Sequence, residues 1–530
     1  MNRDLNSENQ AVLIAALANP TCYPHPVGSV QHLETHISHI LLAGDYAYKI
    51  KKPLNLGFLD FTSLERRRRY CYEEIRLNRR LAPQLYLDCI PLSGSLENPV
   101  LGGDPANALE YAVKMRRFSQ AALLDRCLAE GRVQAHHFDA LARQLAGFHG
   151  TIARVDPDRP WGTPAQVQQP VQDNFATLRQ LLTSSADLEP LEYLEQWTLA
   201  TYRRLQDTLA ARRSHGFIRE CHGDLHLGNM LLEHDRIVIF DCIEFNDAFR
   251  WIDVMSDLGF LLMDLHQRGA GGLAWRLLNG YLAAGADYGG LQVLPYYQVY
   301  RALVRAKIGA IRLHQPDLSP AQRAAVETAC RSYLELAVSF TRPFPPFLLI
   351  THGVSGSGKS YLTAQLADAP GAVRIRSDVE RKRLFGLEAL ENSHSGLGQG
   401  LYTADAGRRT YERLSTLAEQ ILTAGYPVLV DATFLEPAQR QVFRNLAATL
   451  GVPFILLACE ADPDILRARV ARRRDQGEDA AEADVAVLER QLQNYQPPPS
   501  EERPLFAAGR DGDNVRAAVL ARLQEPGHAR

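Results

Sequence analysis

The chain contains the run Glu220-Cys-His-Gly-Asp-Leu-His-Leu-Gly-Asn-Met-Leu-Leu232, and a second apolar run, Ile237-Val-Ile-Phe240, is followed at once by Asp241. Between the two runs lies Glu233-His-Asp-Arg236, a polar segment with the composition of a turn. Two apolar runs separated by so short a polar segment predict a β-hairpin. Such a hairpin would bring the side chains before its first strand close to those after its second strand.

Three polar side chains flank the predicted hairpin, namely the carboxylates of Asp224 and Asp241 and the amide of Asn229. Phosphoryl transfer uses such a set, because one carboxylate accepts the proton of an attacking hydroxyl while an amide and a second carboxylate hold Mg²⁺ on the phosphates. We therefore expect Asp224 to be a catalytic base and Asn229 and Asp241 to be metal ligands. The pattern His222-Gly-Asp-x-x-x-x-Asn229 resembles the catalytic segment of the aminoglycoside phosphotransferase and choline kinase class, distant relatives of protein kinases.

Two strands are predicted upstream, over residues 32–42 and 46–50, with the turn residues Gly44-Asp45 between them. Lys49 and Lys51 follow each other at a spacing of two and so project from the same face of the second strand. In the resembled fold one strand lysine holds the nucleotide phosphates, and the resemblance assigns this role to Lys49. Lys51 remains a rival, and a solvated pair of lysines on an edge strand is the structural alternative.

Several acids complete the set that the resemblance implies. Glu74, on a charged helix predicted to follow the lysine strand, is expected to pair with Lys49, and Glu73 is the alternative. Beyond the hairpin, Asp257 matches the family's structural acid, which bonds the catalytic loop, and Glu244 is a candidate second metal neighbour. One feature departs from the family pattern, because no glycine-rich phosphate loop precedes Lys49.

A second phosphate-binding motif begins after the apolar run 347–351, which is predicted to be a buried strand, and a helix is predicted to open at Tyr361. The glycine-rich segment between them is a complete P-loop. Its backbone N–H groups would surround the phosphates of ATP, its lysine would reach the β and γ oxygens, and its last serine would ligate Mg²⁺. The predicted nucleotide-binding residues are Gly353, Ser355, Gly356, Ser357, Gly358, Lys359 and Ser360.

Later segments complete the expected P-loop site. Asp378 follows a short strand and resembles the base of small P-loop kinases, and a helix N-cap formed by Ser377 or Asp378 is a compatible structural role. Asp431 ends a buried strand at the Walker B position, where it would organise the metal shell. Arg469 and Arg473 lie on an arginine-rich helix that resembles the lid of such kinases, and a plain basic helix face is the alternative.

Composition excludes several classes of protein. The 530 residues have a net charge of −3, so a nucleic-acid partner would need a local basic patch rather than the whole surface. The eight cysteines are scattered and form no C-x-x-C pair, which favours reduced thiols and a cytoplasmic protein. No run approaches the length of about 18 apolar residues that a membrane helix needs, and the polar N-terminus does not resemble a signal peptide.

The predicted fold is an α+β protein-kinase-like (aminoglycoside phosphotransferase) domain fused to an α/β P-loop NTPase domain with a parallel sheet. The predicted segments are an N-terminal helical extension (1–29), the kinase-like domain (30–341), a proline-rich linker (342–346), the P-loop kinase domain (347–524) and a disordered tail (525–530). The second domain resembles the group of gluconate kinase, zeta toxin and phage polynucleotide kinase. The whole chain resembles the bacterial bifunctional aminoglycoside phosphotransferase/ATP-binding protein family.

The functional expectation is a bifunctional phosphotransferase that uses ATP and Mg²⁺ at two separate sites. Each site would phosphorylate a hydroxyl of a small molecule such as a sugar, an aminoglycoside-like compound or a nucleoside. One alternative is a P-loop ATPase switch with a silent kinase-like half. A further alternative, suggested by the arginines, is an RNA 5′-hydroxyl kinase, whose activity would fall steeply with salt. Fold does not determine the acceptor, so neither acceptor follows from the resemblance.

Overall fold

The computed structural model describes residues 5–316, 318–342, 344–368, 371–393, 400–476, 480–507 and 512–525. By compactness the chain divides into two units. The first consists of Met1–His137, Thr151–Asp173 and Gln206–Asp264, and the second of Phe138–Gly150, Asn174–Leu205 and Leu265–Arg530. The second unit combines helices of the predicted kinase-like domain with the P-loop half, so the domain boundaries stay predictions. The predicted tail lies outside the described residues except for Glu525.

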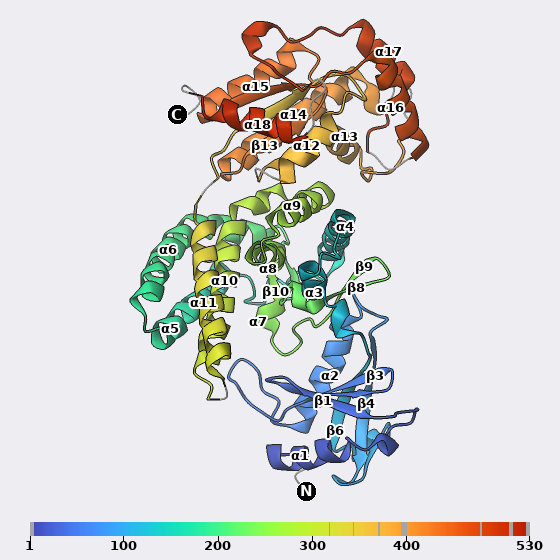
Figure 1. Cartoon of the computed structure of the whole chain (residues 1–530), viewed down its shortest axis with the longest axis vertical. Helices are drawn as coiled ribbons and strands as arrows, with labels where there is room; N and C mark the ends of the chain where they lie inside the picture. The colour runs from blue at the N-terminus through green and yellow to red at the C-terminus, as the bar shows by residue number, and fades with distance from the viewer. Residues whose placement is uncertain are drawn as a thin grey trace. The chain divides into compact units, whose positions relative to one another are not determined.

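An antiparallel six-stranded sheet opens the first unit, with strand order β1-β2-β3-β6-β4-β5 (Figure 1). Its strands are β1 (Val30–Glu34), β2 (Ser38–Ala43), β3 (Tyr46–Lys51), β4 (Tyr86–Gly94), β5 (Pro99–Leu101) and β6 (Glu110–Arg116). The single strand predicted over residues 32–42 is wrong. The chain turns between Thr35 and Ser38, where the Ser38 N–H donates to the Thr35 hydroxyl at 2.9 Å and so ends β1.

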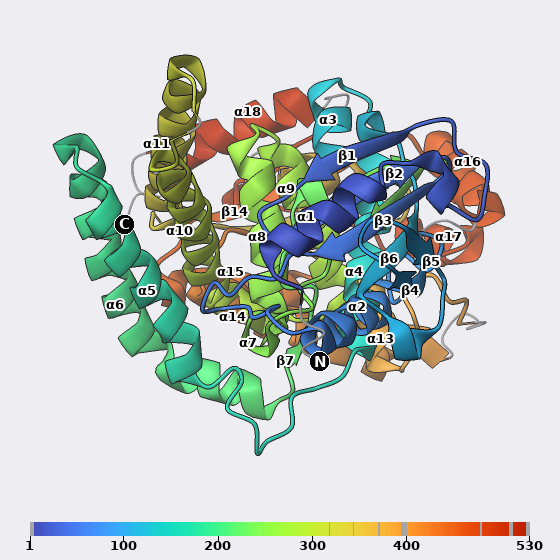
Figure 2. The same ribbon diagram turned by 90° about the horizontal axis from the view of Figure 1, so that it is seen from below.

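Two helices pack on this sheet. Helix α1 (Ser7–Ala16) buries Leu13 and Ile14 in an apolar cluster with β2 and β3, and Figure 2 shows it lying across these strands. The predicted charged helix is α2 (Leu64–Asn78), which starts at its N-cap Ser63. Its arginine run is not a uniform basic face, because Arg67 is fully buried and its Nε donates to both carboxylate oxygens of Glu110, each at 2.9 Å.

The predicted catalytic hairpin is present as β8 (Met230–Glu233) and β9 (Arg236–Ile239). The other strands that flank it are β7 (Ile218–Glu220) and β10 (Trp251–Asp253), which pair antiparallel. The remaining helices before the second sheet are α3 (Leu124–Ala129), α4 (Ala135–Thr151), α5 (Pro164–Leu181), α6 (Ser185–Ser214), α7 (Asp247–Arg250), α8 (Val254–Gln267), α9 (Gly271–Gly285), α10 (Leu294–Leu313) and α11 (Pro320–Phe340). None of the described helices is both long and apolar enough to cross a membrane.

A parallel five-stranded sheet forms the centre of the P-loop half, with strand order β12-β13-β11-β14-β15. The strands are β11 (Leu348–His352), β12 (Val373–Arg376), β13 (Val428–Asp431), β14 (Phe454–Ala458) and β15 (Leu505–Phe506). Its helices are α12 (Lys359–Asp368), α13 (Ser377–Leu384), α14 (Ala404–Thr423), α15 (Pro437–Leu450), α16 (Pro463–Gln476), α17 (Val485–Gln493) and α18 (Gly512–Leu523). Helices α12 and α18 pack on one face of the sheet. The carboxyl ends of β11, β12 and β13 therefore meet at one edge, as a P-loop site requires.

Candidate active sites

The hairpin β8–β9 positions the first site. His234 and Asp235 at its tip both have positive φ, 49° and 61°, the conformation that lets two strands reverse within two residues. Beyond the last paired residues, the Phe240 N–H donates to the Asn229 carbonyl at 3.0 Å. Asn229 and Asp241 consequently lie next to each other although 12 positions separate them in the sequence.

Asp224 lies beside the start of this hairpin. The Asn229 side-chain amide donates to the Asp224 carboxylate and to its backbone carbonyl, each at 3.0 Å. The Asp224 side chain is 38% exposed, so an acceptor hydroxyl in solution can reach it. The loop that carries it is held by buried acids, because Asp257 accepts the backbone N–H groups of His222 and Gly223 at 3.0 and 2.9 Å. This contact is the one expected of Asp257 from the sequence.

The structure separates the two rival lysines on β3. The Lys49 Nζ lies 2.7 Å from Asp241 and 2.8 Å from Glu74, and its side chain is 11% exposed. Lys51 is fully buried, 2.7 Å from the other carboxylate oxygen of Glu74, and also pairs with Glu244. Burial alone would raise the pKa of Glu74, but the two ammonium groups lower it to about 2. Glu74 therefore stays charged at the junction of both lysines.

Two sequence alternatives are resolved by these contacts. Glu73 pairs with Arg76 on its own helix at 2.7 Å, so Glu74 is the acid of α2 that meets the strand lysines. Glu244 is buried against Lys51, which disfavours its role as a second metal neighbour.

Asp241 has φ of 65°, a conformation that non-glycine residues rarely adopt and that is common at functional sites. Its carboxylate and the Asn229 amide are oxygen donors of the kind that Mg²⁺ prefers.

A cavity of about 620 Å³ opens between the sheet and the segment that follows β6. Its lining residues are Gln31, Leu33, Leu42, Arg117, Phe118, Ser119, Gln120 and Arg126. Leu42 and Phe118 also border an apolar cluster that contains Ala47 and Leu231. The β1–β2 turn contains no glycine, consistent with the missing phosphate loop.

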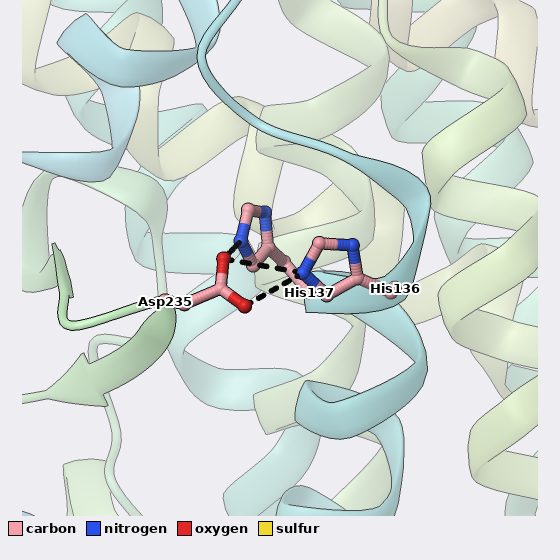
Figure 3. Close-up of side chains that lie close together, drawn as sticks. All are labelled: His136, His137 and Asp235. Carbon is pink, nitrogen blue, oxygen red and sulfur yellow. Dashed lines mark hydrogen bonds and ion pairs between the residues drawn. The ribbon is translucent and has the colours of Figure 1, made fainter.

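The hairpin tip is tied to the first turn of α4 (Figure 3). The Asp235 carboxylate lies 2.7 Å from His137 Nε2 and 3.1 Å from His136 Nε2, and the two imidazoles lower the pKa of Asp235. The Gln134 N–H donates to His137 Nδ1 at 2.9 Å. Because His137 Nδ1 accepts this hydrogen bond, Nε2 is the ring nitrogen that donates to Asp235, which indicates a hydrogen-bonded clamp rather than a metal ligand.

The P-loop connects β11 to α12, as the sequence predicts. Gly353 has φ of 145°, and a Cβ at this position would lie 2.3 Å from the Cys459 carbonyl oxygen, so only glycine fits. The Lys359 Nζ curls back to donate to the carbonyls of Gly353 and Val354 at 2.9 and 2.8 Å, and burial lowers its pKa. These carbonyls are weaker partners than a phosphate for an ammonium group, so the loop is suited to take up a polyphosphate.

One P-loop amide already has a partner that the sequence did not reveal. The Ser355 N–H donates to the side-chain oxygen of Gln491, on α17, at 2.7 Å. On α16, the guanidinium of Arg469 donates to the Gly356 carbonyl at 3.2 Å. Arg473 instead donates to the Ala483 carbonyl at 3.0 Å. Of the two predicted lid arginines, Arg469 thus lies directly on the phosphate loop.

The acids of the P-loop half lie at the edge of the sheet. Asp431 is buried at the end of β13, 2.6 Å from Arg374 on β12, and the Arg374 guanidinium also donates to the Ser360 carbonyl at 3.0 Å. Burial alone would raise the pKa of Asp431, but Arg374 and Arg376 lower it. Asp378 lies in the first turn of α13 and is 30% exposed. The N-cap role suggested for this position is wrong, because Arg376 is the N-cap and makes no side-chain cap.

Family models match both halves of the chain. The one described as "Phosphotransferase enzyme family" matches residues 58–294, and the one described as "AAA domain" matches residues 348–498. Together with the two sheets, these matches confirm the predicted fold class. The chain is therefore an ATP-dependent kinase or phosphotransferase.

The relatives define the family more narrowly. An uncharacterized protein of Mycobacterium tuberculosis is 30% identical over 476 residues, which cover 89% of this chain and 92% of that protein. An uncharacterized protein of Mycobacterium bovis matches to the same extent. The chain belongs to this family of phosphotransferase domains fused to P-loop kinase domains.

Solved structures resemble each half separately. A choline/ethanolamine kinase family protein from Mesorhizobium loti is 15% identical with a TM-score of 0.37, and the match covers 63% of this chain and 98% of that chain. A gluconokinase from Sinorhizobium meliloti is 22% identical with a TM-score of 0.25, and the match covers 34% of this chain and 93% of that chain. Neither likeness identifies an acceptor.

Proposed function

We propose that the chain is a bifunctional phosphotransferase with two separate sites that both use ATP and Mg²⁺. Each site would transfer the γ-phosphoryl group to a hydroxyl of a small molecule, such as a sugar, an aminoglycoside-like compound or a nucleoside. We also propose the cytoplasm as its location, since all eight cysteines are free thiols.

In the first site, Asp224 would accept the proton of the attacking hydroxyl, because it is the exposed carboxylate of the catalytic loop. Lys49 would exchange its contact with Asp241 for the nucleotide phosphates, and Glu74 would keep it in place. Asp241 and Asn229 would then hold Mg²⁺. The observation that carries this proposal is the meeting of β3, α2 and the hairpin at Lys49, since this joins a phosphate-binding cation to a metal-binding acid.

In the second site, the P-loop backbone and Lys359 would hold the phosphates, and the Ser360 hydroxyl with Asp431 would organise Mg²⁺. Asp378 would act as the base, and Arg469 would neutralise charge on the transferred group. Arg473 would need to leave the Ala483 carbonyl to join it. The position of Arg469 on the phosphate loop supports this assignment.

The test measures ADP release by wild type, Asp224→Ala and Lys359→Ala, first without an acceptor and then with pooled metabolites, aminoglycosides and 5′-hydroxyl RNA. Two working kinases predict that acceptors stimulate turnover and that each substitution removes a different part of it. Transfer of γ-labelled phosphate to an isolated product would establish the acceptor. If turnover ignores every acceptor and only Lys359→Ala abolishes it, the proposal is wrong.

That last outcome would favour the alternative of a P-loop ATPase switch. Its structural support is the direct contact of α17 with the phosphate loop through Gln491. Nucleotide binding to the loop or release from it would change this contact and so affect that helix. The RNA 5′-hydroxyl kinase remains the other alternative. A steep loss of RNA phosphorylation with salt would favour it, because contacts to RNA phosphates release counterions.

A further inference from the structure

The first site contains a second lysine that no nucleotide role explains. The two carboxylate oxygens of Glu74 are divided between two ammonium groups, one oxygen lying 2.8 Å from Lys49 and the other 2.7 Å from Lys51. Each lysine also contacts an acid of the segment after the hairpin, Asp241 for Lys49 and Glu244 for Lys51. The two lysines therefore have Glu74 as a common ion-pair partner.

Lys51 cannot itself contact a phosphate, because its side chain is fully enclosed whereas that of Lys49 is 11% exposed. The Phe61 ring lies 5.0 Å from its ammonium group. Its backbone carbonyl accepts a hydrogen bond from the Gln10 side chain at 2.8 Å, and the same amide donates to Glu110 at 2.9 Å. Lys51 is thus held through its side chain, by Glu74 and Glu244, and through its backbone carbonyl, by Gln10.

A single lysine would face a conflict during turnover. When Lys49 turns from Asp241 to the phosphates, its ammonium group is shared between the phosphates and Glu74, and a buried carboxylate with too few partners is costly. Lys51 removes this conflict, since it keeps one oxygen of Glu74 paired whatever Lys49 does. Its contact with Glu244 fixes the segment that carries Asp241.

We propose that Lys51 is a positioning residue that holds Glu74 and Glu244 and thereby sets the places of Lys49 and Asp241 for phosphoryl transfer. The inference rests on the proposed function of the first site. It differs from a purely structural ion pair in what it predicts for variants that remain folded.

The test compares the double variant Lys51→Met/Glu244→Gln with the matched variant Lys52→Met/Glu34→Gln, which removes the neighbouring surface ion pair instead. The double variant removes both members of one buried pair, a change that is often tolerated, and leaves Glu74 paired with Lys49. It should therefore fold, and thermal unfolding checks this. We expect a fall of about 10-fold or more in kcat of the Asp224-dependent reaction, with KM for ATP changed by less than about 3-fold. The surface variant should keep the wild-type kcat.

A second readout needs no acceptor. An adenosine acyl-phosphate probe acylates the amine of a lysine that lies beside bound phosphates and releases the nucleotide. Mass spectrometry should find the acyl group on Lys49 and not on Lys51 in the wild type, and weaker labelling of Lys49 in Lys51→Met/Glu244→Gln. Acylation of Lys51 with Lys49 unmodified would overturn the inference, as would a folded double variant with wild-type kcat and labelling. If the wild type labels neither lysine and shows no Asp224-dependent turnover, the proposed function itself fails.

Discussion

The two candidate sites differ in how they are assembled. The P-loop gathers its phosphate-binding groups within residues 353–360, so one strand, one loop and one helix suffice to place them. The kinase-like site joins Lys49 to Asp241 across 192 positions and needs a sheet, a helix and a hairpin to do so. A local motif therefore defines a nucleotide site by itself, whereas a dispersed site is defined only by the fold around it.

The sites share one feature. In each, the acid proposed to bind the metal is neutralised by a basic side chain, Asp241 by Lys49 at 2.7 Å and Asp431 by Arg374 at 2.6 Å. They differ in exposure, since the Asp241 side chain is 41% exposed and that of Asp431 only 4%. A metal can therefore compete more easily for Asp241 than for Asp431.

The largest effect is expected for Asp224→Asn, which keeps the shape of the side chain but removes the base. We expect about a 10³-fold loss of kcat in the first site, because general-base catalysis contributes about 10²–10⁴-fold. Nucleotide affinity should be unchanged, since Asp224 is not among the proposed phosphate-binding groups. Single-turnover kinetics and calorimetric ATP binding measure the two quantities. A loss shared by the Lys359-dependent reaction would contradict the independence of the sites.

Lys359→Ala should have the next largest effect, confined to the P-loop site. We expect a loss of about 10²–10³-fold in turnover there, because the ammonium group stabilises charge on the transferred phosphoryl group. The Asp224-dependent reaction should continue at the wild-type rate. The measurement is product formation by each site with its own acceptor. Equal losses in both reactions would show that the two sites do not work separately.

Arg374→Met tests whether Arg374 and Mg²⁺ compete for the buried carboxylate of Asp431. Asp431 would lose its closest partner, so we expect the P-loop half to be destabilised by about 2 kcal/mol in the absence of Mg²⁺. Added Mg²⁺ and ADP should restore more stability to this variant than to wild type, because Asp431 is then available to the metal shell. Thermal unfolding with and without Mg²⁺ and ADP measures this.

The control for that comparison is Arg408→Met, which removes an exposed arginine that pairs with Asp405 and Glu412 on the same helix. Its stability should change little, with or without the metal, because exposed ion pairs contribute little to stability. The same restoration in both variants would argue against competition at Asp431.

The smallest effect concerns pH and the P-loop half. His352, the last residue of β11, is fully buried, and this burial, with Arg440 and Lys359 nearby, lowers its pKa to about 4. The folded state therefore binds fewer protons than the unfolded state between pH values of about 4 and 6.5, so the His352 contribution is complete above about 6.5 and is lost as the pH falls. We expect it to cost about 1 kcal/mol of stability at about pH 6.

Urea unfolding at neutral pH and at about pH 6 measures this contribution, and His352→Gln should reduce the difference between the two values. Wild type and variant would lose equal stability on acidification if His352 were already protonated in the folded state.

The features encoded in contiguous residues could be predicted from the amino-acid sequence. The P-loop, the hairpin β8–β9 and the neighbours Asp224 and Asn229 all follow from local spacing, because turns and short loops need few residues to specify them. The fold class followed as well, since both motifs came with their strands and helices in the expected order. The strand predicted over residues 32–42 failed because its alternating pattern continues through the turn at Thr35.

Which of several similar residues contact one another depends on how distant segments pack together. Lys49 and Lys51 are equivalent by spacing, but the fold leaves the first partly exposed and encloses the second with Glu244, 193 positions away. Likewise, nothing near Gln491 in the sequence indicates that it binds a P-loop amide 136 positions away. Burial and ion pairing arise between segments that are distant in the chain, so their partners exist only once the segments have packed together.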